Sequence, residues 1–167
     1  KTLIFFSLGL AFQVFGQTVF SYYNLVLKVE IPYPSLADLG YFFSIPLYIY
    51  GAILLGKVSG AGLSFKSVHK KILAILIPIA ALILSYFIFL KGYEFDWLNP
   101  LKIFLDFGYP FGQAIYVSLA LLVYLLSKNS LGGIMRPKVL TILFALIVQY
   151  IADYNFLYQA QHGTWLN

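Results

Sequence analysis

Five long apolar segments, separated by short polar connectors, dominate the chain. They cover about residues 2–27, 36–57, 69–90, 100–127 and 137–159. A helix rises about 1.5 Å per residue and needs about 20 apolar residues to cross the hydrocarbon core of a membrane. Each segment meets or approaches that length. The pattern therefore predicts an all-α fold, a polytopic transmembrane bundle of five helices that forms a single domain over residues 1–167.

Capping signals mark where several of these helices begin. Ser35 precedes the second segment and Asp38 follows three residues later, which is the spacing of a capping box. Asn99 and Pro100 place a capping side chain and then a proline at the first position of the fourth helix. Pro137 opens the fifth helix. These signals agree with the boundaries that the apolar pattern predicts.

The composition indicates a membrane protein. Hydrophobic residues make up 61% of the chain and charged residues only 10%. A soluble domain carries about 25% charged residues, so this chain lacks the polar surface to cover itself in water, and the lipid bilayer is its predicted partner. The net charge of +5 does not indicate nucleic-acid binding, because no basic stripe with interleaved aromatic residues accompanies it. Cysteine is absent, which excludes disulfides and thiol chemistry.

The charges are sorted by side of the predicted membrane. All carboxylates lie on connectors or helix ends of one parity: Glu30, Asp38, Glu94, Asp96, Asp106 and Asp153. Most basic residues lie on the other: Lys1, Lys57, Lys66, Lys70, Lys71, Lys128, Arg136 and Lys138, with Lys28, Lys91 and Lys102 as the exceptions. Cytoplasmic loops are enriched in Lys and Arg. The pattern therefore predicts a multi-pass protein of the cell (inner) membrane with a cytoplasmic N-terminus and an acidic, aromatic external face.

Two short patterns recur with a common period. Asp38-Leu-Gly-Tyr41 returns 68 residues later as Asp106-Phe-Gly-Tyr109, and a pattern around Gln13 returns around Gln149 at twice that distance. The spacing predicts a helical hairpin repeated three times, with a sixth helix expected beyond the last residue. Chance matching between aromatic-rich membrane helices is the alternative.

Nine side chains form a predicted ligand-binding set near the external face. Lipid offers no hydrogen-bond partners, so polar groups are expected to face the bundle interior, and carboxylates in membrane helices are functional candidates. Counting turns predicts that Asp106 and Asp153 both lie near the outer boundary. The set is Gln17, Tyr22, Asp38, Tyr41, Asp106, Tyr109, Gln113, Asp153 and Tyr158. The alternative is that each residue only caps a helix or joins two helices, and Tyr33, Trp97 and Trp165 are interpreted as interface anchors.

Catalysis finds little support in the sequence. His69 and His162 are the only histidines, and no three or four His, Cys or carboxylate residues have the spacing of a zinc site. No nucleophile with an adjacent base is evident. We therefore expect no enzymatic activity, no catalytic residues, no metal site and no cofactor.

Three blocks resemble a known class of membrane module. They run from Tyr22 to Asp38, from Asp106 through Tyr109-Pro110 to Gly112, and from Ala152 to Thr164. The chain is similar in these blocks to the N-terminal polytopic membrane modules of bacterial signalling proteins, which precede diguanylate cyclase, phosphodiesterase or histidine kinase domains. The resemblance implies a sensory role. This chain departs from that pattern because it has fewer helices, no effector domain, and Gln113 where a second Asp is expected.

Three functions are consistent with these patterns. In the first, an integral membrane sensory module binds a small external or lipid-soluble ligand in a polar aromatic pocket, and the hairpins shift about Pro46 and Pro110. In the second, the chain is an accessory or scaffold subunit that packs against other protein subunits of a membrane complex. In the third, it is a small transporter whose carboxylates bind a cation or proton.

Overall fold

The computed structural model describes residues 1–29, 31–59, 68–127 and 135–162, and it shows five long helices in these ranges. They are α1 (Thr2–Ser21) with a π-helical end η1 (Tyr22–Leu27), α2 (Leu36–Val58), α3 (Val68–Ser85) with a π-helical end η3 (Tyr86–Leu90), α4 (Pro100–Ser127) and α5 (Met135–His162). No strand occurs in the described ranges. The predicted all-α fold with five helices is confirmed.

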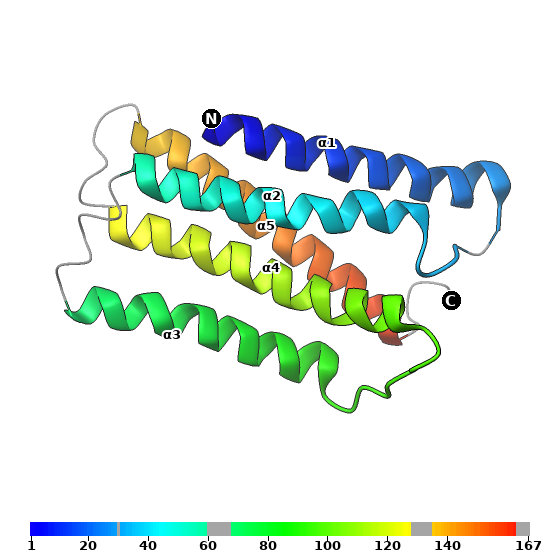
Figure 1. The fold of residues 1–167 in the computed structure, drawn as a ribbon. Helices are drawn as coiled ribbons and strands as arrows, with labels where there is room; N and C mark the ends of the chain where they lie inside the picture. The colour runs from blue at the N-terminus through cyan, green and yellow to red at the C-terminus, as the bar shows by residue number, and fades with distance from the viewer. Residues whose placement is uncertain (30, 60–67, 128–134, 163–167) are drawn as a thin grey trace.

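The helices lie side by side, and successive helices run in opposite directions (Figure 1). α1 packs along α2, α2 against α4, and α4 also against α3 and α5. α4 is therefore the central helix, and a large share of its residues is buried, including Leu105, Tyr109 and Tyr116. The hairpins α1–α2 and α3–α4 meet through α2 and α4.

The outer surfaces of the bundle are apolar. All five helices are long and apolar enough to cross a membrane. On α1, η1 and α3 few side chains are buried, and large hydrophobic residues such as Leu3, Leu25, Ile75 and Leu84 are exposed. Lipid accommodates such surfaces at no cost, whereas water does not. The chain is a multi-pass membrane protein.

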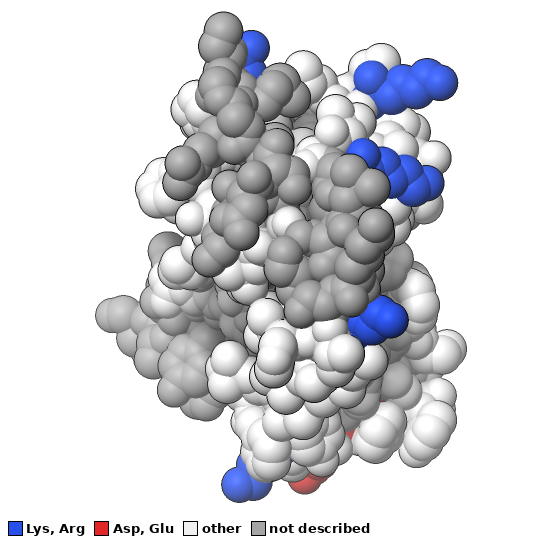
Figure 2. Space-filling view, turned by 90° about the vertical axis from the view of Figure 1, so that its left-hand side faces the viewer, with Lys and Arg blue, Asp and Glu red and all other residues white. Residues whose placement is uncertain are grey.

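Charges differ between the two ends of the bundle. At one end lie the connectors 28–35 and 91–99, and we call it the acidic end because Glu94, Asp96 and Asp106 lie there. At the other end α2 and α4 finish and α3 and α5 begin, and the N-terminus lies there too. Figure 2 looks onto this second end, where Lys and Arg side chains appear in blue. Which end is cytoplasmic stays a prediction.

Glycine lets α1 and α2 approach at backbone distance. A Cβ atom added to Gly40 would lie 2.5 Å from the Phe12 carbonyl oxygen and 2.5 Å from the Gly16 nitrogen. Both neighbours are backbone atoms, so no side chain could move away. Small residues at such crossings are the usual means by which membrane helices pack closely.

The predicted cap of α2 is confirmed. The Ser35 hydroxyl oxygen accepts a hydrogen bond from the Ala37 backbone N–H at 3.2 Å, and the Asp38 carboxylate accepts one from the Ser35 backbone N–H at 2.6 Å. Together they form a capping box. Pro46 and Pro110 lie inside the continuous helices α2 and α4.

Candidate functional site

Asp106 joins two connectors at the acidic end. Its Oδ1 atom accepts a hydrogen bond from the Tyr33 hydroxyl at 2.7 Å, and its Oδ2 atom accepts one from the Tyr93 hydroxyl at 2.6 Å. Tyr33 belongs to the connector between η1 and α2, and Tyr93 belongs to the connector between η3 and α4. A single carboxylate on α4 therefore bonds with the turns of both hairpins at the acidic end.

Asp38 makes a second link, between α2 and α4. While its Oδ2 atom serves the cap of α2, its Oδ1 atom accepts a hydrogen bond from the Tyr109 hydroxyl at 2.7 Å. Tyr109 is buried, so removal of the carboxylate would leave its hydroxyl with the longer contact of 3.4 Å to the Asp38 backbone oxygen. We call Tyr33, Asp38, Tyr93, Asp106 and Tyr109 the acidic-end site.

The two connector tyrosines stay protonated at neutral pH. Partial burial, followed by the hydrogen bond to Asp106 and its negative charge, raises the pKa of Tyr33 well above its usual value. The same causes, with a contribution from Asp96, raise the pKa of Tyr93 to about 12. Both phenols are therefore hydrogen-bond donors to the Asp106 carboxylate, which is the acceptor of both bonds.

Aromatic rings surround Tyr93. The Tyr93 ring lies 5.3 Å from the rings of Phe95 and Phe107 between centroids, in edge-to-face arrangements. Phe95 also stacks on Trp97 at 5.4 Å and on Phe107 at 5.8 Å. Trp97 is mostly exposed. The carboxylate of Asp106 thus lies beside a wall of aromatic faces and edges, part of which is accessible from outside.

A second polar cluster lies deeper in the bundle. The Asp153 carboxylate accepts hydrogen bonds from the Gln113 amide at 2.9 Å and from the Gln149 amide at 2.7 Å. Gln149 also donates to Gln13 of α1 at 3.2 Å, and Gln13 donates to Ser44 of α2 at 3.4 Å. Because Gln113 lies at the midpoint of α4, this inner cluster is far from both ends of that helix.

Asp153 lies deeper in the bundle than Asp106. Its partner Gln113 lies seven residues beyond Asp106 on α4, or ~10 Å along the helix axis, and α5 continues nine residues beyond Asp153 to His162. Its position near the outer membrane boundary stays a prediction. Asp106, by contrast, bonds with the connectors at the acidic end.

The described members of the predicted set fall into separate hydrogen-bonded groups, and a common ligand pocket stays a prediction. Asp38, Asp106 and Tyr109 meet in the acidic-end site, whereas Gln113 and Asp153 meet in the inner cluster. Two further members, Tyr41 and Gln17, form a pair in which the Tyr41 hydroxyl donates to the Gln17 side chain at 2.9 Å. Tyr22 is exposed on η1, and the side chain of Tyr158 lies outside the described residues.

Two connector tyrosines were not in the predicted set. Tyr33, interpreted from the sequence as an interface anchor, bonds with Asp106, and so does Tyr93. The partners are 73 and 13 residues apart in the chain. A local pattern carries no signal for the first of these contacts, and hairpin packing is needed to find it.

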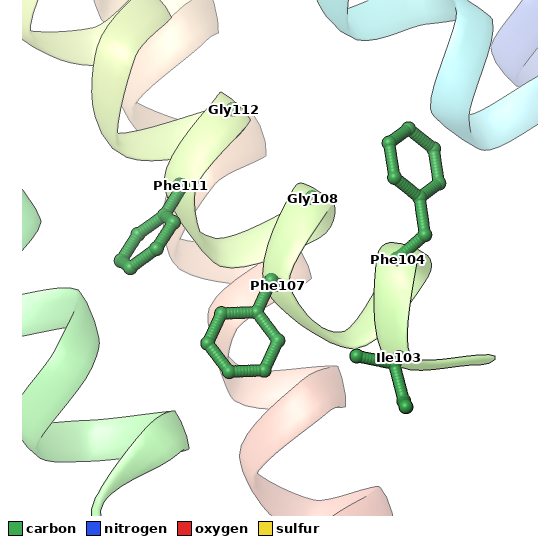
Figure 3. A pocket seen from close by; sticks show the side chains of 6 residues that line it. All are labelled: Ile103, Phe104, Phe107, Gly108, Phe111 and Gly112. Carbon is green, nitrogen blue, oxygen red and sulfur yellow. The ribbon is translucent and has the colours of Figure 1, made fainter. Parts of the chain in front are cut away.

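Two hollows in the surface are apolar. One, of about 330 Å³, is lined by Ile103, Phe104, Phe107, Gly108, Phe111 and Gly112 of α4 (Figure 3). Another, of about 580 Å³, is lined by Leu82, Ile83, Tyr86, Phe87, Phe111 and Ile115 of α3, η3 and α4. Their linings suit lipid chains. Among the described residues, no group of three or more His, Cys, Asp and Glu side chains could hold a metal ion.

The hydrogen bonds of Asp38 and Asp106 do not test whether the two hairpins are copies of one repeat. Asp38 and Asp106 both lie toward the acidic end of the second helix of a hairpin, but Asp38 closes a cap while Asp106 bonds two connectors. Internal duplication stays a prediction.

Comparison with protein-family models, with curated proteins and with solved structures gave no match.

Proposed function

We propose that the chain is a membrane-embedded sensory module whose ligand binds at the acidic-end site. The observation that supports this most strongly is the double hydrogen bond of Asp106, because it joins the turns of both hairpins through one carboxylate. A ligand that competes for this carboxylate changes how the two turns are held. The excess of basic residues at the opposite end supports an external position for the site.

The chemistry of the site favours an organic ammonium ligand. A carboxylate attracts the positive charge, and aromatic faces bind alkylammonium groups through cation–π interactions. Both features are present within one short stretch, because Tyr93 bonds with Asp106, the Phe95 ring contacts the Tyr93 ring, and the Trp97 ring stacks on Phe95. Glu94 and Asp96 add negative charge to the same connector.

Competition at Asp106 gives a route for a signal. An ammonium group at the carboxylate would displace the Tyr33 or Tyr93 hydroxyl and free the connector that carries it. The two hairpins meet through α2 and α4, so a freed connector permits a shift of one hairpin against the other. Such a shift follows only if the ligand binds the displaced arrangement more tightly than the closed one.

A second candidate is an accessory or scaffold subunit of a larger membrane complex. One observation favours it: the oxygens of Asp38, Asp106 and Asp153 already accept hydrogen bonds from this chain's own donors. In that case these bonds serve stability alone, and no small ligand is required.

Tetramethylammonium titration of the purified full chain tests the sensory proposal. In a Trp165→Phe background Trp97 is the remaining tryptophan, and it lies in the aromatic wall. We expect a saturable change in its fluorescence, measured against sodium chloride at equal ionic strength. Asp106→Asn should weaken binding by about tenfold or more, because a hydrogen-bonded charge contributes about 1.5–3 kcal/mol.

Glu94→Gln is the matched control, since it removes one negative charge from the same connector at an exposed position. It should change the affinity by less than about twofold, as expected for a screened surface charge. Equal affinities of the parent and of Asp106→Asn for tetramethylammonium would contradict the proposal. Loss of thermal stability in Asp106→Asn, with no fluorescence response in any variant, would favour the scaffold candidate.

A further inference from the structure

Two deeply buried polar atoms in the inner cluster have no hydrogen-bond partner in the described structure. They are the amide oxygen Oε1 of Gln113 and the hydroxyl of Tyr116. Gln113 is 4% exposed and Tyr116 only 1%. Native proteins rarely bury such atoms without a partner, and an exception points to a bound water or ion.

Gln113 lies by the Asp153 carboxylate, and Tyr116 lies within electrostatic range of it. Gln113 donates its amide N–H to Asp153, which places the other end of the same amide group beside that carboxylate. Tyr116 is one turn further along α4, on the same face of the helix, and it is within electrostatic range of Asp153. Tyr48 of α2 also lies within that range.

Asp153 has no cationic partner in the described part of the chain. Its hydrogen-bond donors, Gln113 and Gln149, are neutral amides. On α4 the nearest basic residue to Gln113 is Lys102, ~16 Å away along the helix, and on α5 the described Lys138 is ~22 Å from Asp153. A carboxylate at this depth in a membrane protein is costly unless a positive charge accompanies it.

We infer that the inner cluster is an intramembrane site for one small monovalent metal cation, sodium in the first instance. The Asp153 carboxylate and Gln113 Oε1 supply hard oxygen ligands, and the Tyr116 hydroxyl binds the cation or a water molecule on it. One negative charge matches one positive charge, which favours a monovalent over a divalent ion. The inference rests on residues other than those of the acidic-end site.

The site lies where helices of different hairpins meet. Gln149 and Asp153 come from α5, Gln113 and Tyr116 from α4, and Gln13 reaches the cluster from α1. A cation that holds Asp153 and Gln113 together therefore stabilises the contact between α4 and α5. Its loss loosens the contact that α5 makes with the rest of the bundle.

Binding of radioactive ²²Na⁺ to the full chain in lipid nanodiscs tests the inference. We expect one saturable site per chain that unlabelled sodium chloride competes for and choline chloride does not. Potassium chloride in a parallel arm shows which alkali ion the site prefers. A hundredfold excess of sodium over its Kd should raise the midpoint of thermal unfolding by about 5 °C or more relative to choline.

Asp153→Asn should weaken ²²Na⁺ binding by about tenfold or more, because it removes the charged ligand. Tyr116→Phe keeps the shape of the side chain and provides a second variant that is expected to fold. It should weaken sodium binding by several-fold and remove part of the sodium-dependent thermal shift. Tyr50→Phe, which alters an exposed tyrosine on α2, is the matched control and should bind sodium like the parent.

Three results would overturn the inference. One is ²²Na⁺ binding to the parent that does not exceed binding to Asp153→Asn. Another is a thermal midpoint that depends on pH but not on sodium, which would identify a proton as the counter-charge. The third is a Tyr116→Phe variant whose thermal midpoint exceeds that of the parent by the same margin in sodium as in choline, which would show that the hydroxyl takes no part in sodium binding.

Discussion

Gly40→Ala is expected to lower the free energy of unfolding by about 3 kcal/mol, at the upper end of the range for overpacking. The added Cβ atom would lie 2.5 Å from two backbone atoms of α1, so relief requires the two helices to move apart. That movement weakens the whole α1–α2 contact. The measurement is the midpoint of thermal unfolding in detergent, which should fall by roughly 6–12 °C.

Gly56→Ala on the same helix is the matched control. A Cβ atom at Gly56 meets a methyl group of the Val123 side chain at 3.0 Å. A side chain can adjust by a few tenths of an ångström where a backbone cannot, so we expect a change of no more than about 1 kcal/mol. Equal midpoints for Gly40→Ala and the parent would show that α1 and α2 do not cross at Gly40 and Gly16.

Asp38→Ala should have the second large effect, a loss of about 3 kcal/mol in the free energy of unfolding. It removes one half of the α2 capping box, which is worth about 1 kcal/mol. It also removes the charged acceptor of the buried Tyr109 hydroxyl, which adds about 1.5–3 kcal/mol. Chemical or thermal unfolding in detergent measures the sum.

Ser35→Ala separates the two contributions, because it removes the other half of the cap and leaves the Tyr109 bond in place. It should cost about 1 kcal/mol. If Asp38→Ala costs no more than Ser35→Ala, then the bond between α2 and α4 contributes nothing to stability. The link that we assign to Asp38 would then be wrong.

Helix positions follow from the sequence because each apolar run has the length that a membrane requires and carries its own start signal. The cap at Ser35 and Asp38 is an example, since both halves of the box lie within four residues. Long-range pairings do not follow in this way. The bond between Tyr33 and Asp106 depends on how one hairpin packs against the other, and no local pattern records that packing.

Gln13 and Gln149 show a different limit of sequence patterns. The sequence pairs them as equivalent positions of a repeat, 136 residues apart, whereas in the structure they are partners in a hydrogen bond of 3.2 Å between α1 and α5. Similar polar residues on two membrane helices are expected in either case, because an amide inside a membrane bundle needs a hydrogen-bond partner from the protein. Sequence similarity alone does not distinguish two equivalent positions of a repeat from two residues that contact each other.

The two polar groups differ in how accessible they are from water. The acidic-end site lies at connectors with exposed aromatic residues, where a ligand from water has access. The inner cluster lies at the middle of α4 and is closed by helices on several sides. Tyr41, which bonds with Gln17, is within electrostatic range of both Asp38 and Asp153.

Labelling of single cysteines tests most directly whether the acidic-end site faces outward. The chain has no native cysteine, so Glu94→Cys and Lys57→Cys each introduce one exposed thiol, at opposite ends of the bundle. In intact cells a membrane-impermeant maleimide should label Glu94→Cys, and it should label Lys57→Cys only after permeabilisation. Labelling of Lys57→Cys in intact cells, with Glu94→Cys protected, would contradict an external ligand site at Asp106.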